Sequence, residues 1–463
     1  MKRVTCFSLL LLSACAAGPD YRRPLAATPA AFKEGGIQWK KAQPESVSLA
    51  GWWKIFGDPQ LNALEAQVVI SNQNIKAAEA SYRQARALVA VARSAYFPSV
   101  TASASTARGN AGTTYDAALD VVWEIDVWGR IRRTVEAGEA AAQTSAADLA
   151  AARLSAQADL ATDYLQLRVT DAQSRLLSNT VTAYTKSLQL TQNQYAAGVA
   201  GRADVVQAET QLASARAQAT DIGVQRAQLE HAIALLVGKP PASFSIAPSP
   251  EVPPVPEIPP GLPSALLERR PDIAGAERAM AAANAQIGVA EAAFFPDLTL
   301  PASGGFTDHS FAHWFSLPNR LWAVAPTLAE TLFDAGLRSA QVAGARATYD
   351  QSVATYRQTV LAAFQQVEDN LAAQRILKEE TTMQNTAVAS SQQSVRLTTN
   401  QYKAGTVSYL NIVTAQAIEY NNENASLTIL GRRLTAAVTL IKALGGGWNA
   451  AEMDNPPLEK PHG

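Results

Sequence analysis

The chain contains two copies of one structural unit. The segment that begins at Tyr96 (YFPSVT) matches the segment that begins at Phe294 (FFPDLT). The segment that begins at Asn193 (NQYAAG) matches the segment that begins at Asn400 (NQYKAG), 207 positions later. Because self-similarity over such a distance marks a repeat architecture, we expect each copy to fold as the same series of elements.

Proline marks the boundaries between these copies. Ten of the 24 prolines lie between Pro240 and Pro263, and none occurs at 99–239 or 327–455. Because proline breaks helices and central strands, the proline-rich stretch predicts an extended linker. We therefore expect an N-terminal extended segment, a first copy, a linker, a second copy and a polar tail, at residues 15–59, 60–247, 248–261, 262–447 and 448–463.

Each copy predicts long helices. An alanine-rich helix is expected at 60–95, and a run without proline at 130–196 would form one helix of about 100 Å. A glycine-containing turn at 198–201 leads to a returning helix at 203–237. Apolar residues recur by heptads along both, which favours an antiparallel coiled coil, and Arg226 alone interrupts the returning seam. A soluble helical bundle would show the same heptads.

The segment between the helices predicts two strands, at 99–127, around a turn at 109–112. Odd positions from Tyr115 to Val127 are all apolar, whereas most even positions are acidic. Because neighbouring residues of a strand face opposite sides, one face suits lipid and the other an aqueous lumen. A soluble hairpin packed on a core is the alternative. The acids predicted to face the lumen are Asp116, Asp120, Glu124 and Asp126.

The second copy predicts two more strands, near 297–306 and 319–328, although their alternation is less clear. One chain thus supplies four strands. A barrel around a lumen needs about eight, so several chains must contribute. Aromatic residues bracket the strands, as in an interfacial girdle: Tyr96, Phe97, Trp128, Phe294, Phe295 and Phe333.

The N-terminus indicates the compartment. Residues 1–3 are basic at two positions and 4–12 are apolar, which is too short to span a bilayer and predicts a signal peptide at 1–14. The signal ends in Leu-Ser-Ala before Cys15, a pattern that resembles a bacterial lipobox, in which the cysteine is lipidated. An ordinary secretory signal with an incidental Cys15 is the alternative. Ala16, in place of an Asp that favours inner-membrane retention, indicates the outer membrane.

Composition argues against several classes of function. The 39 Lys and Arg balance 40 Asp and Glu, so nucleic acid is not an expected partner. The two cysteines, Cys6 and Cys15, exclude a disulfide framework and a cysteine metal site. His309 and His313 are four residues apart, but they fall in a predicted loop and read as an exposed pair. No catalytic or phosphate-loop motif is present, so we expect neither enzymatic activity nor a cofactor.

Together these segments resemble the TolC-like outer membrane factors, of the lipidated OprM/NodT branch. The matching stretches lie at 15–21, 52–59, 123–130, 266–273 and 290–296. The resemblance implies a mainly α fold: a homotrimer with a 12-stranded membrane barrel and a long periplasmic α-helical tunnel. It also implies the exit duct of a tripartite efflux system, carrying small molecules, docked to a periplasmic adaptor (membrane fusion) protein and an inner-membrane pump of the proton-driven RND type.

The same resemblance places the periplasmic tip at the ends of the coiled coils, at 195–205 and 402–412. In the family these turns bind the adaptor, and nearby polar side chains keep the resting tunnel shut. Tyr402 occupies the position of the family's gating tyrosine. Asn411 and Thr414 stand where some members have an acidic ring. The implied tip and gate residues are Tyr195, Gly198, Asp204, Gln207, Tyr402, Gly405, Asn411 and Thr414.

Two other readings fit parts of the sequence. One is a lipid-anchored periplasmic coiled-coil scaffold without a pore, and the other is a hydrolase with helical decoration. Detergent dependence separates the scaffold from the duct, because a membrane barrel needs a substitute for lipid and a scaffold without a barrel does not. The hydrolase lacks a candidate nucleophile and base.

We predict that Cys15 carries the lipid. Cys15→Ser should abolish fatty-acid labelling, while integration of the protein into the outer membrane survives because the strands supply an apolar band of their own. Continued labelling of this variant would contradict the assignment.

Overall fold

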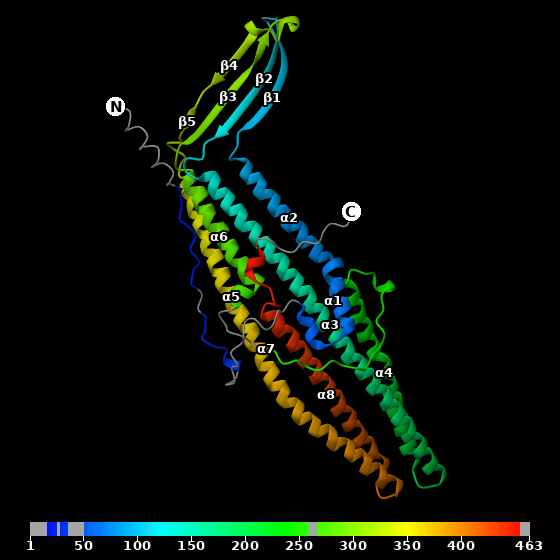
Figure 1. Ribbon diagram of the computed structural model, residues 1–463. Coiled ribbons are helices and arrows are strands. Elements are labelled where there is room, and N and C mark those ends of the chain that lie inside the picture. The colour runs from blue at the N-terminus through cyan, green and yellow to red at the C-terminus, as the bar shows by residue number, and fades with distance from the viewer. Residues whose placement is uncertain (1–15, 26–27, 36–50, 111, 259–265, 454–463) are drawn as a thin grey trace. The chain divides into compact units, whose positions relative to one another are not determined.

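The computed structural model describes residues 16–25, 28–35, 51–110, 112–258 and 266–453 (Figure 1). The expected signal peptide and Cys15 lie outside the described residues, as do the end of the linker and most of the C-terminal tail. The described residues form two compact units. Unit 1 takes its residues from 1–27, 79–148 and 272–360, and unit 2 takes the rest.

The helices repeat in length from one copy to the other. Helix α3 and helix α7 have 67 residues each, and α4 and α8 have 35 each. This confirms the predicted single helix over 130–196 and its repeat. The helices are α1 (Pro59–Ser71), α2 (Gln73–Ser94), α3 (Arg130–Ala196), α4 (Arg202–Leu236), α5 (Leu266–Arg269), α6 (Pro271–Ala292), α7 (Leu337–Lys403) and α8 (Tyr409–Ala443).

The expected single helix over 60–95 is wrong, because Asn72 divides it into α1 and α2. Asn72 is buried and extended, and its side-chain oxygen accepts from the backbone nitrogens of Asn74 and Ile75 at 3.0 and 3.1 Å. Its side-chain nitrogen donates to the carbonyl oxygen of Leu236 at 2.9 Å. An asparagine at this position caps the following helix, which the alanine-rich pattern could not reveal.

The two long helices end in equivalent glycine turns. Gly198 and Gly405 have φ values of 75° and 72°, the left-handed region that a β-carbon strains. In each turn a backbone nitrogen just beyond the glycine reaches back into the last turn of the helix: Val199 to the Gln194 oxygen at 2.8 Å, and Thr406 to the Gln401 oxygen at 3.0 Å. This geometry satisfies the terminal carbonyls and confirms the predicted reversals.

A buried charge network joins α3, α4 and the linker in unit 2. The Asp171 carboxylate accepts from Arg226 at 2.8 Å and from Arg168 at 3.3 Å. It also accepts from the backbone nitrogen of Ser249 at 2.9 Å, and Arg226 donates to the Ile246 oxygen at 2.6 Å. Arg226 therefore interrupts the apolar seam because it pairs with a buried acid and holds the chain just before the linker.

The N-terminal segment 16–25 packs against the rest of unit 1. The buried Arg133 donates to the carbonyl oxygens of Ala17 and Gly18, at 3.1 and 3.3 Å, and to the carboxylate of Asp20 at 3.0 Å. The Ala17 nitrogen donates to the Trp128 oxygen at 2.9 Å. The chain just after Cys15 is thus tied to the turn that precedes α3.

Unit 1 contains an antiparallel sheet in the order β1–β2–β3–β4. Where one strand was expected over 319–328, two occur, and both pair with β3. Pro326 lies between them and has no backbone donor, which interrupts the ladder. The strands are β1 (Ser99–Gly109), β2 (Gly112–Glu124), β3 (Asp297–Asp308), β4 (Arg320–Val324) and β5 (Thr327–Ala329).

None of the helices within the described ranges has an apolar stretch long enough to cross a membrane.

Helix α1 carries a buried acid, Glu65, which has no solvent exposure and no hydrogen-bond partner among the described residues. Burial raises the pKa of its carboxyl to about 9, because desolvation disfavours the charged form. Because the pKa of Glu65 is higher in the folded state, its neutral carboxyl favours the folded state. This contribution to the free energy of unfolding is fully present below the unfolded pKa, near 4.5, and is lost as the pH rises toward about 9.

We therefore predict that wild type loses stability relative to Glu65→Gln between pH 5 and pH 7, by on the order of 2 kcal/mol. Thermal unfolding in detergent at several pH values measures the difference. Glu209→Gln, at an exposed site on α4, is the control and should show no such trend. Parallel curves for wild type and Glu65→Gln would contradict the prediction.

Candidate functional site

The register of the sheet sorts its side chains into two faces. Asp120 of β2 lies opposite Thr101 of β1 and Ser303 of β3. Asp116 lies opposite Ser105 and Thr307 in the same way, and the Thr307 hydroxyl donates to its carboxylate at 2.6 Å. Directly paired residues share a face, so carboxylates flanked by hydroxyls form rows across three strands.

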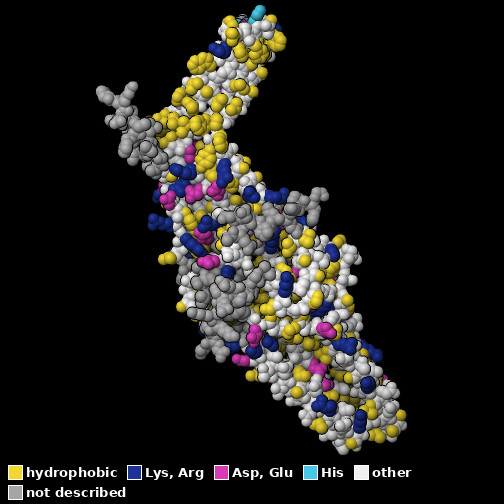
Figure 2. Space-filling model, in the orientation of Figure 1, with side chains coloured by type: hydrophobic (Ala, Val, Ile, Leu, Met, Phe, Trp, Pro, Cys, Tyr) yellow, Lys and Arg dark blue, Asp and Glu magenta, His cyan; other side chains and the backbone are white. Residues whose placement is uncertain are grey.

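The other face of the sheet is apolar. Figure 2 shows hydrophobic side chains gathered over the strands, and Trp322 of β4 is 73% exposed. The alternation of β3, unclear in the sequence, follows from its pairing with β2. Residues that share this face are Val100, Ala102, Ala104, Ala117, Leu119, Val121, Trp123, Leu298, Leu300, Ala302, Phe306, Trp322 and Val324.

Aromatic side chains stand at both ends of the apolar face. At the helix end, Trp128 stacks on Phe295 at 4.8 Å, and the Trp123 nitrogen donates to the Tyr96 oxygen at 3.0 Å. This is where the bracketing aromatics were expected. At the far end, Tyr115 contacts Phe311 and Trp314, and Phe306 contacts Phe315, a group that sequence reasoning missed. Tyr115 and Trp123 are eight residues apart, or about 26 Å along a strand.

The four acids assigned to the polar face differ in their surroundings. Asp116 and Asp120 make no ion pair within the described residues. Glu124, at the end of β2, accepts from two nitrogens of Arg130, one of them at 3.0 Å. Asp126 lies beyond β2, and its carboxylate accepts from the backbone nitrogens of Ile131 and Arg132 at the start of α3. Asp126 thus caps a helix, and the strand alternation does not extend to it.

The two hairpin ends of unit 2 pack against each other through buried tyrosines. Tyr402 is 5% exposed and Tyr409 is 1% exposed, with their ring centres 5.7 Å apart. The Tyr402 hydroxyl donates to the Thr191 hydroxyl at 3.3 Å, and the Gln194 amide donates to the Tyr402 carbonyl oxygen at 3.3 Å. Burial raises the pKa of the Tyr402 phenol, and the charge of Asp204 raises it further. Sequence reasoning found Tyr402 but missed Tyr409, Thr191 and Gln194, which carry no motif.

The remaining predicted tip residues differ in their surroundings. The Asp204 carboxylate accepts from the Gly201 nitrogen at 3.1 Å and caps α4. Tyr195, the first-copy counterpart of Tyr402, is 46% exposed. Gln207 is half-buried on α4, whereas Asn411 and Thr414 are exposed on α8. Asp204 thus lies close enough to Tyr402 for its charge to act on the phenol, whereas Tyr195, Asn411 and Thr414 are exposed.

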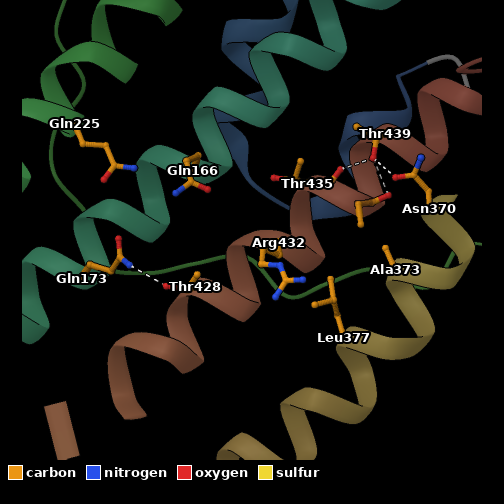
Figure 3. Close-up of a pocket in the computed structure, with 11 residues that line it drawn as sticks. Gln166, Gln173, Gln225, Asn370, Ala373, Leu377, Thr428, Arg432, Thr435 and Thr439 are labelled. Atoms are coloured by element: carbon orange, nitrogen blue, oxygen red, sulfur yellow. Dashed lines mark hydrogen bonds between the residues drawn. The ribbon is translucent and has the colours of Figure 1, made fainter. Parts of the chain in front are cut away.

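A polar cavity of about 480 Å³ lies between the helices of unit 2 (Figure 3). Its lining comes from α3, α4, α7 and α8 and consists mainly of amides and hydroxyls, with Arg432 as the one charged residue. The Gln173 amide donates to the Thr428 hydroxyl at 3.5 Å. This lining can hydrogen-bond to water or a polar solute but offers no nucleophile with a base. Within the described ranges no group of His, Cys, Asp or Glu has the arrangement of a metal site.

Comparison with known proteins identifies the class. The family model of the outer membrane efflux protein family matches residues 65–239 and 262–446, and the chain belongs to this family. The probable efflux pump outer membrane protein TtgC of Pseudomonas putida is 32% identical over 454 residues, 95% of this chain and 94% of its own. Outer membrane protein OprJ of Pseudomonas aeruginosa is 31% identical over 455 residues, 95% of this chain and 94% of its own.

Solved structures of outer-membrane channels have the same fold as this chain. The outer-membrane channel OprN superposes with a TM-score of 0.88 at 31% identity, over 94% of this chain and all of that one. The Campylobacter jejuni CmeC outer membrane channel gives a TM-score of 0.89 over 95% of this chain and 96% of that one; at 24% identity it shows the fold alone. The chain is thus an outer-membrane efflux channel protein, as the resemblance implied. TtgC is named as an efflux pump protein and OprJ as an outer membrane protein, and neither is named as an enzyme.

The repeat-related tyrosines give a matched test of the hairpin packing. Tyr402→Ala removes a buried ring, a change that costs roughly 3 kcal/mol or more in a packed core, so amide exchange at 188–196 and 400–412 should speed up by about a hundredfold. Tyr195→Ala, at the exposed counterpart, should change these rates less than about threefold, because little packing is lost. Equal effects of the two substitutions would show that the buried cluster does not hold the hairpin ends together.

Proposed function

We propose that the chain forms a homotrimeric exit duct of a tripartite efflux system, which carries small molecules from the periplasm or the pump to the outside. The observation that carries this proposal is the two-faced sheet. Its polar rows include uncompensated carboxylates, whereas its other face is apolar and ends in aromatic groups about 26 Å apart along a strand. At the tilt of about 40° that barrel strands have, this length covers roughly 20 Å of membrane, comparable with the height of an apolar band. Water on one side and lipid on the other satisfy both faces.

The edges of the sheet support the trimer. Within the described residues β1 pairs only with β2, and β4 pairs only with β3, so each outer edge has unpaired backbone groups. Four strand positions cannot enclose a lumen, because about eight is the practical minimum. Three copies, joined edge to edge, would supply twelve.

We propose that Cys15 is lipidated and anchors the chain in the outer membrane. The binding of segment 16–25 along unit 1 supports this, since the Ala17 nitrogen donates to the Trp128 oxygen. Trp128 belongs to the aromatic group at the helix end of the sheet. An acyl chain on the preceding cysteine would therefore start at the level of this group.

We propose that the hairpin ends dock the periplasmic adaptor and close the resting duct, and that an inner-membrane pump of the proton-driven RND type supplies the energy. Closure rests on neutral packing, because Tyr402 and Tyr409 are buried together while Asn411 and Thr414 carry no charge. The glycine turns at Gly198 and Gly405 form the ends of the two hairpins and would meet the adaptor there. The remaining proposed tip residues are Tyr195, Asp204 and Gln207.

Ion selectivity tests the duct. Like charges on a narrow wall raise the local concentration of cations. Asp116→Asn with Asp120→Asn should therefore lower the cation selectivity that reversal potentials report in planar bilayers under a salt gradient. Because a closed hairpin end would mask the pore, both proteins are measured in the Tyr402→Ala background. Native mass spectrometry of the same samples should give three copies.

Glu251→Gln, at an exposed linker position, is the control and should leave the reversal potential unchanged. Unchanged selectivity in the double variant would contradict the assignment of the polar face to the lumen. A folded protein that never conducts would favour a scaffold without a pore.

A further inference from the structure

The apolar face of the sheet has a hollow of about 610 Å³ across β2, β3 and β4. Its lining combines residues with little or no side chain, such as Ala302 and Gly304, with larger ones, among them Leu119, Phe306 and Trp322. A β-carbon on Gly304 would have no atom within 4 Å, so the space above this residue is open. The volume lies in the range of about 300 to 1,000 Å³ that small-molecule sites occupy.

A lone cation borders one end of this hollow. Arg320 begins β4 and pairs with Phe306, which places its side chain on the apolar face. It is exposed and makes no ion pair within the described part of the chain. Arginine at such a position lays its apolar stem along the surface and presents a forked guanidinium to the membrane interface.

The aromatic group at the same end indicates the depth of Arg320. The Trp314 nitrogen donates to the Phe306 oxygen at 3.2 Å, and Phe315 contacts the Phe306 ring at 5.5 Å. Tyrosine and tryptophan gather where the membrane meets water. Arg320 therefore stands at the level of lipid headgroups, with an apolar hollow beside it toward the membrane interior.

We propose that this hollow and Arg320 form a binding site for an acylated, phosphorylated glycolipid of the outer leaflet, with one acyl chain over Gly304 and a phosphate on the guanidinium. The proposal rests on the proposed function, which turns this end of the sheet outward. Charge complementarity selects the glycolipid, because its phosphate monoesters carry more than one negative charge with no cation attached, and a guanidinium binds phosphate through two parallel hydrogen bonds. A zwitterionic phospholipid also has a phosphate, but its own ammonium offsets that charge and weakens the pairing.

The test uses the full-length protein in nanodiscs that contain phosphatidylethanolamine and bisphosphorylated lipid A. Native mass spectrometry, after release into detergent, counts the lipid A that stays bound to each chain. Arg320→Gln removes the cation, and Gly304→Leu fills the hollow without requiring a positive φ. Each should lower lipid A retention by about tenfold, the effect of losing one charge-assisted contact or the acyl-chain space.

Arg216→Gln is the control. Arg216 is an exposed arginine on α4, in unit 2 and outside the sheet. Retention in this variant should stay within about twofold of wild type, whereas dephosphorylated lipid A should bind wild type about tenfold more weakly than lipid A does.

Equal loss in the Arg320 and Arg216 variants, or equal retention of phosphatidylethanolamine and lipid A by wild type, would overturn the proposal. Conductance of the same samples separates it from the proposed duct. A conducting trimer without selective lipid A retention overturns the lipid site alone, whereas a protein that neither inserts nor conducts overturns both.

Discussion

Backbone pairing between β2 and β3 is the constraint on which the arrangement of unit 1 depends. Strand β2 comes from the first copy of the repeat and β3 from the second, and ten residue pairs join them. This register decides the side on which each polar or apolar residue of the second copy lies, because a shift by one residue would exchange the faces. The carboxylates of Asp116 and Asp120 meet hydroxyls on both sides as a result. Neither copy could present a two-sided sheet of this width by itself.

In unit 2 a comparable role belongs to Asp171. A buried carboxylate is costly unless it is paired and hydrogen-bonded, and Asp171 has two arginines and a backbone nitrogen as partners. These contacts join α3, α4 and the linker between the copies at one place. Beyond this point α3 and α4 run to a hairpin end. There the contacts are between buried aromatic rings, Tyr402 and Tyr409, and not between buried charges.

The repeat is preserved in backbone and altered in side-chain environment. Gly198 and Gly405 make the same turn, but Tyr195 is exposed whereas Tyr402 is buried against Tyr409 and Thr191. Likewise β2 is continuous, whereas its second-copy counterpart is divided at Pro326. Hairpins with the same backbone turn thus have different surfaces. The second hairpin carries the buried Tyr402, and the first carries the exposed Tyr195.

The sequence by itself determined the features that local chemistry controls. Proline and glycine positions predicted the long helices and their turns, and the alternation of β2 predicted its two faces, because these depend on residues close together in the chain. Family resemblance added the channel class. Tertiary structure decided the rest. Asp126 caps α3 instead of continuing a strand, through nitrogens only five and six residues away, which an alternating pattern does not reveal. Asn72 ends a helix because it can bond to Leu236, and Arg320 borders a hollow only because β4 pairs with β3. These last two outcomes depend on contacts between different elements, which the periodicity of a single segment does not record.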